Sequence, residues 1–110
     1  MNLTAQAQVS KSNAVFSTSN AFTQDISFSN YPNPATSQTT VSYTLSTKSK
    51  VNLRVVDLTG KQLALLVNQD QSAGKQEYNW DFSKHKITSG MYILILKIDN
   101  KIYSRKVIVQ

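Results

Sequence analysis

Few side chains in this chain of 110 residues are able to carry acid–base, nucleophilic or metal chemistry. The chain has no cysteine and one histidine, His85, so thiolate sites are excluded and a catalytic triad has a single possible imidazole. His85 stands between Lys84 and Lys86, with no carboxylate nearby in the sequence, and is predicted to be a solvent-exposed loop residue. The sequence therefore offers no histidine-centred catalytic or metal site.

Five of the six carboxylates are scattered through predicted turns and strand ends, at Asp57, Asp70, Glu77, Asp81 and Asp99. None of them forms a pair suited to acid–base catalysis, and Asp57 is instead predicted to cap its own turn through a side-chain hydrogen bond. The oxygen-rich repeats of calcium loops are missing, and the three glycines form no phosphate-binding loop. We therefore expect no enzyme, no metal site and no cofactor.

The formal net charge is +6, from 12 basic and six acidic residues, and every basic residue except Lys11 lies at or after Lys48. These residues are mostly lysines scattered between apolar positions, without the arginine clusters or basic-aromatic patterns that bind nucleic acid. The pattern favours solvated strand edges and turns over a nucleic-acid partner. The longest apolar run, Met91–Leu96, is too short to cross a membrane, so no direct membrane insertion is expected.

Two regions of different composition divide the chain. Residues 1–24 are small and polar without a sustained period, which predicts a flexible linker, disordered or extended. Residues 1–10 have no signal-peptide pattern, so an export signal is expected upstream. Residues 25–110 show short period-2 runs between turn residues, which predict an all-β domain, an antiparallel β-sandwich. The predicted strands are Ile26–Phe28, Thr39–Leu45, Val51–Asp57, Gln62–Val67, Gln76–Asp81, Met91–Ile98 and Lys101–Val109.

Prolines and glycines mark the breaks between these strands. Pro32 and Pro34 cannot donate to a strand ladder, so the first strand is predicted to end before them. The stretch "DLTGK", Asp57–Lys61, suits a type I turn in which Gly60 takes the left-handed position. A turn of the same kind is predicted around Gly74.

The last two predicted strands form a hairpin whose two-residue loop is Asp99–Asn100, because both residues tolerate left-handed backbone. This loop pairs Ile98 with Lys101 and so sets the register of both strands. One face of the hairpin is predicted to be core, with Tyr92, Leu94, Leu96, Ile98, Tyr103, Val107 and Val109. The other mixes apolar and charged side chains, and is either a docking surface or covered by the linker or a loop: Met91, Ile93, Ile95, Lys97, Ile102, Ser104, Lys106 and Ile108.

Tyr78, Trp80 and Phe82 alternate along one predicted strand and its end. Alternating aromatic residues are more typical of a core, but exposed and coplanar rings would indicate a carbohydrate-binding or adhesive module. A second alternative is an Ig-like structural spacer, which would tolerate deletions in the terminal segment "RKVIV". All of these alternatives give the same fold, so the fold does not decide between them.

Three motifs, in this order along the chain, carry a family resemblance. They are "YPNPA" (Tyr31, Pro32, Asn33, Pro34 and Ala35) with the strand after it, "VDLTGKQL" (Val56–Leu63), and "SGMYILILKIDNKIYSRKVIVQ" (Ser89–Gln110). The region from Ile26 to Gln110 resembles the type A C-terminal sorting domain of cargo proteins of the type IX, or Por, secretion system of Bacteroidetes.

This resemblance implies an Ig-like sandwich of about seven strands at the end of a larger secreted protein. It implies a secretion signal that directs the upstream cargo through the periplasm to the cell surface, where the cargo is attached, or into the medium. The implied partners are the outer-membrane translocon, a shuttle protein and a sortase-like peptidase that removes the domain from many members. Self-association through an unpaired edge strand is left open.

The final strand offers an edge, or a basic apolar face, for a partner to bind, and on this basis we predict the residues that the secretion machinery recognises. The recognition residues are Gly90, Tyr92, Lys106, Val107, Ile108 and Val109, with Gly60 and Lys61 as a second patch, although turn and core roles account well for Gly60, Gly90 and Tyr92. Lys106 stands out because a lysine within an apolar terminal strand has no packing reason to be there. The implied cleavage region comprises Ser19, Asn20, Ala21, Phe22, Thr23, Gln24, Asp25, Ile26, Ser27, Phe28, Ser29 and Asn30.

Overall fold

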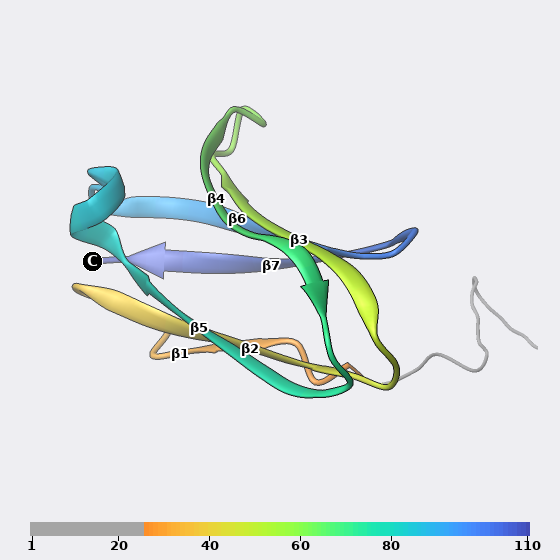
Figure 1. Cartoon of the computed structure of the whole chain (residues 1–110). Coiled ribbons are helices and arrows are strands. Elements are labelled where there is room, and N and C mark those ends of the chain that lie inside the picture. The colour runs from red at the N-terminus through yellow and green to blue at the C-terminus, as the bar shows by residue number, and fades with distance from the viewer. Residues whose placement is uncertain (1–25) are drawn as a thin grey trace, which may run out of the picture.

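The computed structural model describes residues 26–110, which form a sandwich of two antiparallel sheets (Figure 1). The predicted linker, residues 1–24, and the part of the predicted cleavage region before Ile26 lie outside the described residues. The strands are β1 (Ser29–Tyr31), β2 (Gln38–Leu45), β3 (Ser49–Val56), β4 (Gln62–Gln71), β5 (Gly74–Asp81), β6 (Gly90–Ile98) and β7 (Lys101–Val109). One sheet has the order β1-β2-β5 and the other the order β4-β3-β6-β7. The all-β sandwich of seven strands is confirmed.

The core lies between the two sheets and follows from the period-2 pattern of the strands. Along β2, for example, buried residues alternate with half-buried ones from Thr39 to Leu45. Trp80 of the small sheet and Leu94 of the large sheet are both fully buried. Because side chains of successive residues point to opposite faces of a strand, each sheet buries one face and leaves the other outside.

The predicted first strand, Ile26–Phe28, is wrong by three residues, since β1 starts at Ser29. Ser27 has a φ of 49°, which interrupts the extended backbone. Ile26 still contributes one hydrogen bond to the small sheet, from the Thr44 N–H to its carbonyl at 2.6 Å. The strand does end directly before Pro32, as predicted.

The other strands lie where the sequence pattern places them, with shifted ends. The β3 strand starts two residues before Val51 and ends one residue before Asp57. The β4 strand continues past Val67 to Gln71, because its polar last residues still pair with the first residues of β3. Main-chain pairing does not need apolar side chains, so hydrophobic alternation underestimates the length of such an edge strand.

The turn after β3 is built as predicted, around Asp57 and Gly60. Gly60 has a φ of 91°, and its N–H donates to the Asp57 carbonyl at 3.0 Å. The Asp57 carboxylate accepts hydrogen bonds from the Thr59 N–H at 2.9 Å, the Thr59 hydroxyl at 2.6 Å and the Lys61 N–H at 3.0 Å. The hydrogen bond from the Thr59 hydroxyl is the largest of the effects that together lower the pKa of Asp57.

This cap predicts acid sensitivity. A lowered native pKa means that Asp57 stabilises the fold above its unfolded pKa of about 3.9 and that this contribution disappears as the pH falls through the native value. Asp57→Asn keeps an oxygen acceptor but cannot titrate, so we expect the free energy of unfolding to fall less steeply below about pH 4 than in the wild type. Urea unfolding measured from pH 2 to pH 7 checks this. Asp70→Asn is the matched control, and an unchanged slope in Asp57→Asn would contradict the prediction.

Two details of the connections differ from expectation. Gly74 lies where the chain passes from β4 in the large sheet to β5 in the small sheet, so the turn there does not close a hairpin within one sheet. His85 is half-buried, at the end of the 3₁₀ helix η1 (Phe82–His85), and not in an exposed loop. This helix is capped by Asp81, whose carboxylate accepts from the Ser83 N–H and hydroxyl at 2.9 and 2.7 Å.

The terminal hairpin has the predicted register, with Ile98 opposite Lys101 and Gly90 opposite Val109. Asp99 in its loop has a φ of 52°. The predicted core face is confirmed as the inner face. Its residues are buried or half-buried: Tyr92, Leu94, Leu96, Ile98, Tyr103, Val107 and Val109.

Candidate recognition surface

The opening motif lies along the free edge of the terminal strand β7. Residues of β7 alternate between pairing with β6 and pointing their main-chain groups outward. The Asn33 side chain donates to the outward Lys106 carbonyl at 3.2 Å and accepts from the Ile108 N–H at 3.0 Å. Ala35 continues this contact through its main chain, donating to the Ile108 carbonyl at 2.9 Å and accepting from the Gln110 N–H at 2.8 Å. The motif therefore covers the edge of the last part of β7, from Lys106 onward.

Arg105, which directly precedes Lys106 on β7, links the two sheets through hydrogen bonds. It is half-buried on the inner face of β7, and its Nε donates to the Asn30 Oδ1 at 2.9 Å. Its Nη1 donates to the Phe28 carbonyl at 3.2 Å. The segment from Ile26 to Ala35 contains β1 of the small sheet, and these contacts hold it against β7 of the large sheet. Both β1 and β7 are edge strands.

The outer face of the large sheet carries apolar and cationic side chains together. Ile102 is 65% exposed, Met91 40% and Ile108 37%. Cross-strand pairing sets Met91 beside Ile108 and Ile93 beside Lys106. Within the described part of the chain, no loop covers Ile102, Met91 or Ile108, whereas the predicted linker lies outside the described residues. We call the following residues the outer face: Lys50, Asn52, Arg54, Leu65, Asn68, Met91, Ile93, Ile95, Lys97, Ile102, Ser104, Lys106 and Ile108.

The structure divides the predicted recognition residues into two groups. Lys106 and Ile108 lie on the outer face and are exposed, whereas Tyr92, Val107 and Val109 are buried in the core. A folded domain therefore presents only the first two of these five side chains to a partner. The buried three hold the hairpin in the sandwich.

The second predicted patch lies at the same end of the large sheet. Gly60 and Lys61 are exposed in the turn that follows Val56, and Val56 pairs with Ile93, the neighbour of Lys106. Gly90 is also at this end, opposite Val109. The structure thus brings the predicted exposed positions to one end of the sheet, although they come from two different hairpins.

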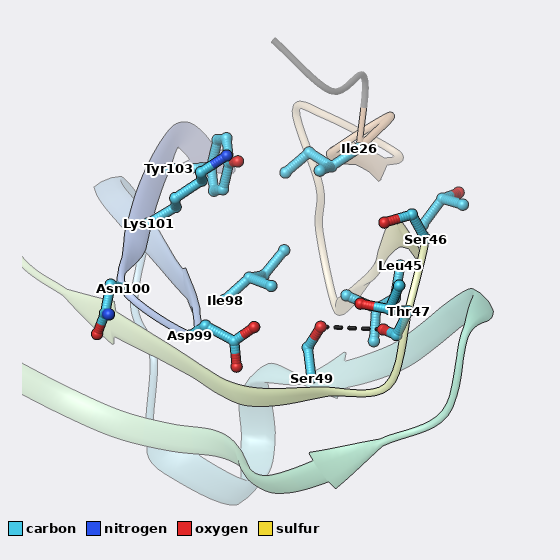
Figure 2. A pocket seen from close by; sticks show the side chains of 11 residues that line it. Ile26, Leu45, Ser46, Thr47, Ser49, Ile98, Asp99, Asn100, Lys101 and Tyr103 are labelled. Carbon is cyan, nitrogen blue, oxygen red and sulfur yellow. Dashed lines mark hydrogen bonds between the residues drawn. The ribbon is translucent and has the colours of Figure 1, made fainter. Parts of the chain in front are cut away.

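A cavity of about 280 Å³ lies at the opposite end of the sandwich, where the described chain begins (Figure 2). Figure 2 shows Ile26 from the small-sheet side and Ile98 from the terminal hairpin pointing into the space between the sheets. Hydroxyl groups line the rim, where the Ser49 hydroxyl donates to the Thr47 carbonyl at 2.9 Å. Its lining combines apolar side chains between the sheets with polar and charged groups of the terminal hairpin, among them Asp99, Lys101 and Tyr103.

The aromatic residues do not form a sugar-stacking surface. Trp80 is 0% exposed and Phe82 is buried beside it, with ring centroids 4.8 Å apart and ring planes at 78°. Tyr78 is half-buried and packs against the core. Because stacking needs exposed and coplanar rings, the surface on which the carbohydrate-binding alternative depended is absent.

Within residues 26–110, no group of three or more His, Asp or Glu side chains is arranged to hold a metal ion. No helix in that range combines the length and hydrophobicity that a membrane crossing needs.

The sequence analysis missed two residues. The Asn33 side chain hydrogen-bonds to the edge of β7 as a main-chain amide would, and Arg105 links the two sheets. Arg105 occupies a core-facing position between Tyr103 and Val107, and a charged residue at such a position signals a partner. That signal was available, but it does not name the partner. Asn30 and Phe28 lie 75 and 77 residues away in sequence.

Residues 29–110 match the family described as the secretion system C-terminal sorting domain. The matched range begins at the first residue of β1 and ends at the last residue of the chain, so it contains all seven strands. No curated protein and no solved structure gives a significant match.

Proposed function

The chain belongs to the family of secretion system C-terminal sorting domains, and we propose that the type IX machinery reads it at the end of the outer face that carries Lys106 and Ile108. The domain is a C-terminal sorting signal for type IX secretion. It acts in export toward the cell surface or the extracellular space and interacts with the type IX machinery. This family is not an enzyme family.

One observation carries the proposed location of the recognition surface: exposed apolar and cationic side chains adjoin at this end of the sheet. Met91 pairs with Ile108, and two residues further along the same face Ile93 pairs with Lys106. Interfaces combine a central apolar contact with charges at its rim, and this arrangement provides both. The backbone edge beside these residues is already occupied by Asn33 and Ala35, so a partner binds side chains here and not a free strand edge.

We assign the binding partners by stage of export. In this proposal residues 25–110 are the sorting domain and residues 1–24 link it to an upstream cargo. The cargo passes through the periplasm, the outer-membrane translocon and the shuttle protein bind the domain, and a sortase-like peptidase then removes it. The cargo is finally attached to the cell surface or released.

The contacts of the first described residues limit where the peptidase cuts. The Ile26 carbonyl is bonded to the Thr44 N–H, the Phe28 carbonyl to Arg105, and Asn30 is buried. A peptidase needs an extended stretch of backbone that is free of such contacts. We therefore place the cut before Ile26, in the part of the predicted region from Ser19 to Asp25.

An export assay tests the function. Residues 19–110 are fused behind a fluorescent reporter that carries a Sec signal, in a host with a working type IX system and in a translocon-deficient strain. We expect fluorescence at the surface or in the medium of the first strain and in the periplasm of the second. Reporter that stays in the periplasm of both strains would show that the domain is insufficient for sorting.

Lys106→Glu in the same fusion is expected to reduce export severalfold, because it reverses a charge at the rim of the proposed apolar contact. The side chain is exposed and forms no ion pair with the described residues, so stability should change by no more than about 0.5 kcal/mol. Lys48→Glu, which reverses an exposed charge between β2 and β3, is the control and should be exported normally. Equal export of the two variants would place the recognition surface elsewhere.

A further inference from the structure

A depression of about 580 Å³ lies on the outer face, at the end opposite Lys106. It is independent of the surface proposed above, because Lys97 and Met91 are six residues apart on β6, roughly 20 Å along the strand. Three strands and the terminal hairpin loop build it. Its lining, here called the basic depression, consists of Lys50, Asn52, Arg54, Asn68, Lys97, Asp99 and Asn100.

Strand register places Asn52 at the centre of the basic depression. Lys50 and Arg54 flank it on the same face of β3, two residues away in each direction. Across the strands it pairs with Lys97 on β6 and with Asn68 on β4. Three cationic side chains therefore surround one amide.

None of these three cations forms an ion pair with the described residues. The ion pair found among residues 26–110, Lys75–Glu77, involves none of the three. Asp99 is the one acidic residue of the lining, and its Oδ1 accepts a hydrogen bond from the Lys50 main-chain N–H at 2.9 Å. Asp70 lies outside the lining but pairs with Lys50 across β3 and β4 on the same face. Counting it, three positive and two negative charges leave an excess of one, which favours an anionic ligand such as a phosphate monoester.

The amide of Asn52 adds a second requirement for the ligand. Its Oδ1 is buried and has no hydrogen-bond partner among the described residues. A buried polar atom without a partner costs free energy, which a donor recovers when it reaches the atom. The long stems of the neighbouring cationic side chains move easily enough to admit such a donor. A ring hydroxyl supplies such a donor while the phosphate stays among the cations, whereas inorganic phosphate carries its hydroxyl groups on the same phosphorus atom that the cations hold.

We infer that the basic depression binds a phosphate monoester carried on a polyhydroxylated ring, as in a sugar phosphate. The Lys50, Arg54 and Lys97 side chains bind the phosphate oxygens, with Arg54 able to make a two-pronged contact. The amides of Asn52, Asn68 and Asn100 bind ring hydroxyls. The same chemistry exists in soluble sugar phosphates and in phosphorylated polyol headgroups of lipids.

A titration of the full chain by ¹⁵N NMR tests the site, with glucose 6-phosphate, glucose and inorganic phosphate as separate probes. Glucose 6-phosphate should shift the amide signals of Lys50, Asn52 and Lys97, and each simpler probe should bind at least about tenfold more weakly. The double variant Lys50→Gln/Lys97→Gln should raise the dissociation constant for glucose 6-phosphate at least about tenfold. The matched control Lys84→Gln/Lys86→Gln removes two exposed charges elsewhere and should change it less than about twofold.

Asn52→Ala separates the role of the amide from that of charge, because it should weaken glucose 6-phosphate binding and leave inorganic phosphate binding unchanged. Equal effects of the two lysine double variants, or equal binding of phosphate and glucose 6-phosphate, would overturn the proposal. Sedimentation with phosphatidylcholine vesicles, with and without phosphatidylinositol 4-phosphate, identifies the source. Binding that is tighter to the phosphorylated vesicles than to glucose 6-phosphate supports a lipid headgroup, and the reverse supports a soluble ligand.

Discussion

Trp80→Ala is expected to lower the free energy of unfolding by about 3–5 kcal/mol, the usual cost of removing a large buried aromatic side chain. Trp80 is 0% exposed and is among the largest fully buried residues of the domain. It packs against Phe82, at the point where β5 passes into η1. Because a domain of this size has a total stability of about 5–15 kcal/mol, this one substitution should bring it close to unfolding at 37 °C.

Far-UV circular dichroism during urea unfolding measures the effect, because the variant lacks the only tryptophan and has no indole fluorescence. Tyr31→Ala is the matched control, since Tyr31 is an aromatic residue that is 80% exposed, and it should change stability by no more than about 0.5 kcal/mol. Trp80→Phe keeps a ring in the core and should cost less than Trp80→Ala. A loss below about 1 kcal/mol in Trp80→Ala would show that the core does not depend on this residue.

The fold was predictable from the sequence because its strands carry period-2 patterns and its turns carry residues with particular backbone preferences. The terminal hairpin shows this best, since the loop residues Asp99 and Asn100 determine a register that the structure reproduces over both strands. The Asp57 turn behaves in the same way, because all of its contacts lie within four residues. Local chemistry of this kind is fully visible in a sequence.

The first strand was misplaced because its position depends on contacts that are distant in sequence. Ile26 and Phe28 alternate as a strand would, but Ser27 takes a left-handed conformation, and the backbone of this segment bonds to Thr44 and Arg105. Alternation of apolar residues shows which side chains of such a segment face the core. It does not show which strand the backbone of the segment bonds to. For the same reason the motif "YPNPA" could be recognised in the sequence, whereas the hydrogen bonds of Asn33 to the terminal strand could not be predicted.

The candidate site was only partly predictable for a related reason. The exposure of Lys106 and Ile108 follows from alternation along a single strand. The basic depression, by contrast, combines Lys50 and Arg54 of β3 with Lys97 of β6, and these residues become neighbours only when the strand order β4-β3-β6-β7 is known. The spacing of residues along a strand shows which face of the sheet each side chain is on. The order of the strands in the sheet decides which side chains of different strands become neighbours.

Arg105→Ala is expected to lower the free energy of unfolding by about 2–3 kcal/mol, because it removes two charge-assisted hydrogen bonds that join the edges of the two sheets. The loss leaves the Asn30 side-chain oxygen and the Phe28 carbonyl without this donor. Arg105→Lys should give an intermediate loss, since one ammonium group cannot reproduce the fork of a guanidinium. Lys101→Ala, at an exposed position of the same strand, is the control.

The same substitution should also release the first strand before the rest of the domain unfolds, because β1 has only three residues and pairs with β2 alone. Chymotrypsin cleavage after Phe28, identified by mass spectrometry, measures this local opening. A local loss of about 2 kcal/mol corresponds to roughly thirtyfold faster cleavage when opening is fast. Cleavage after Phe28 that is as slow in Arg105→Ala as in Lys101→Ala would show that Arg105 does not secure this segment.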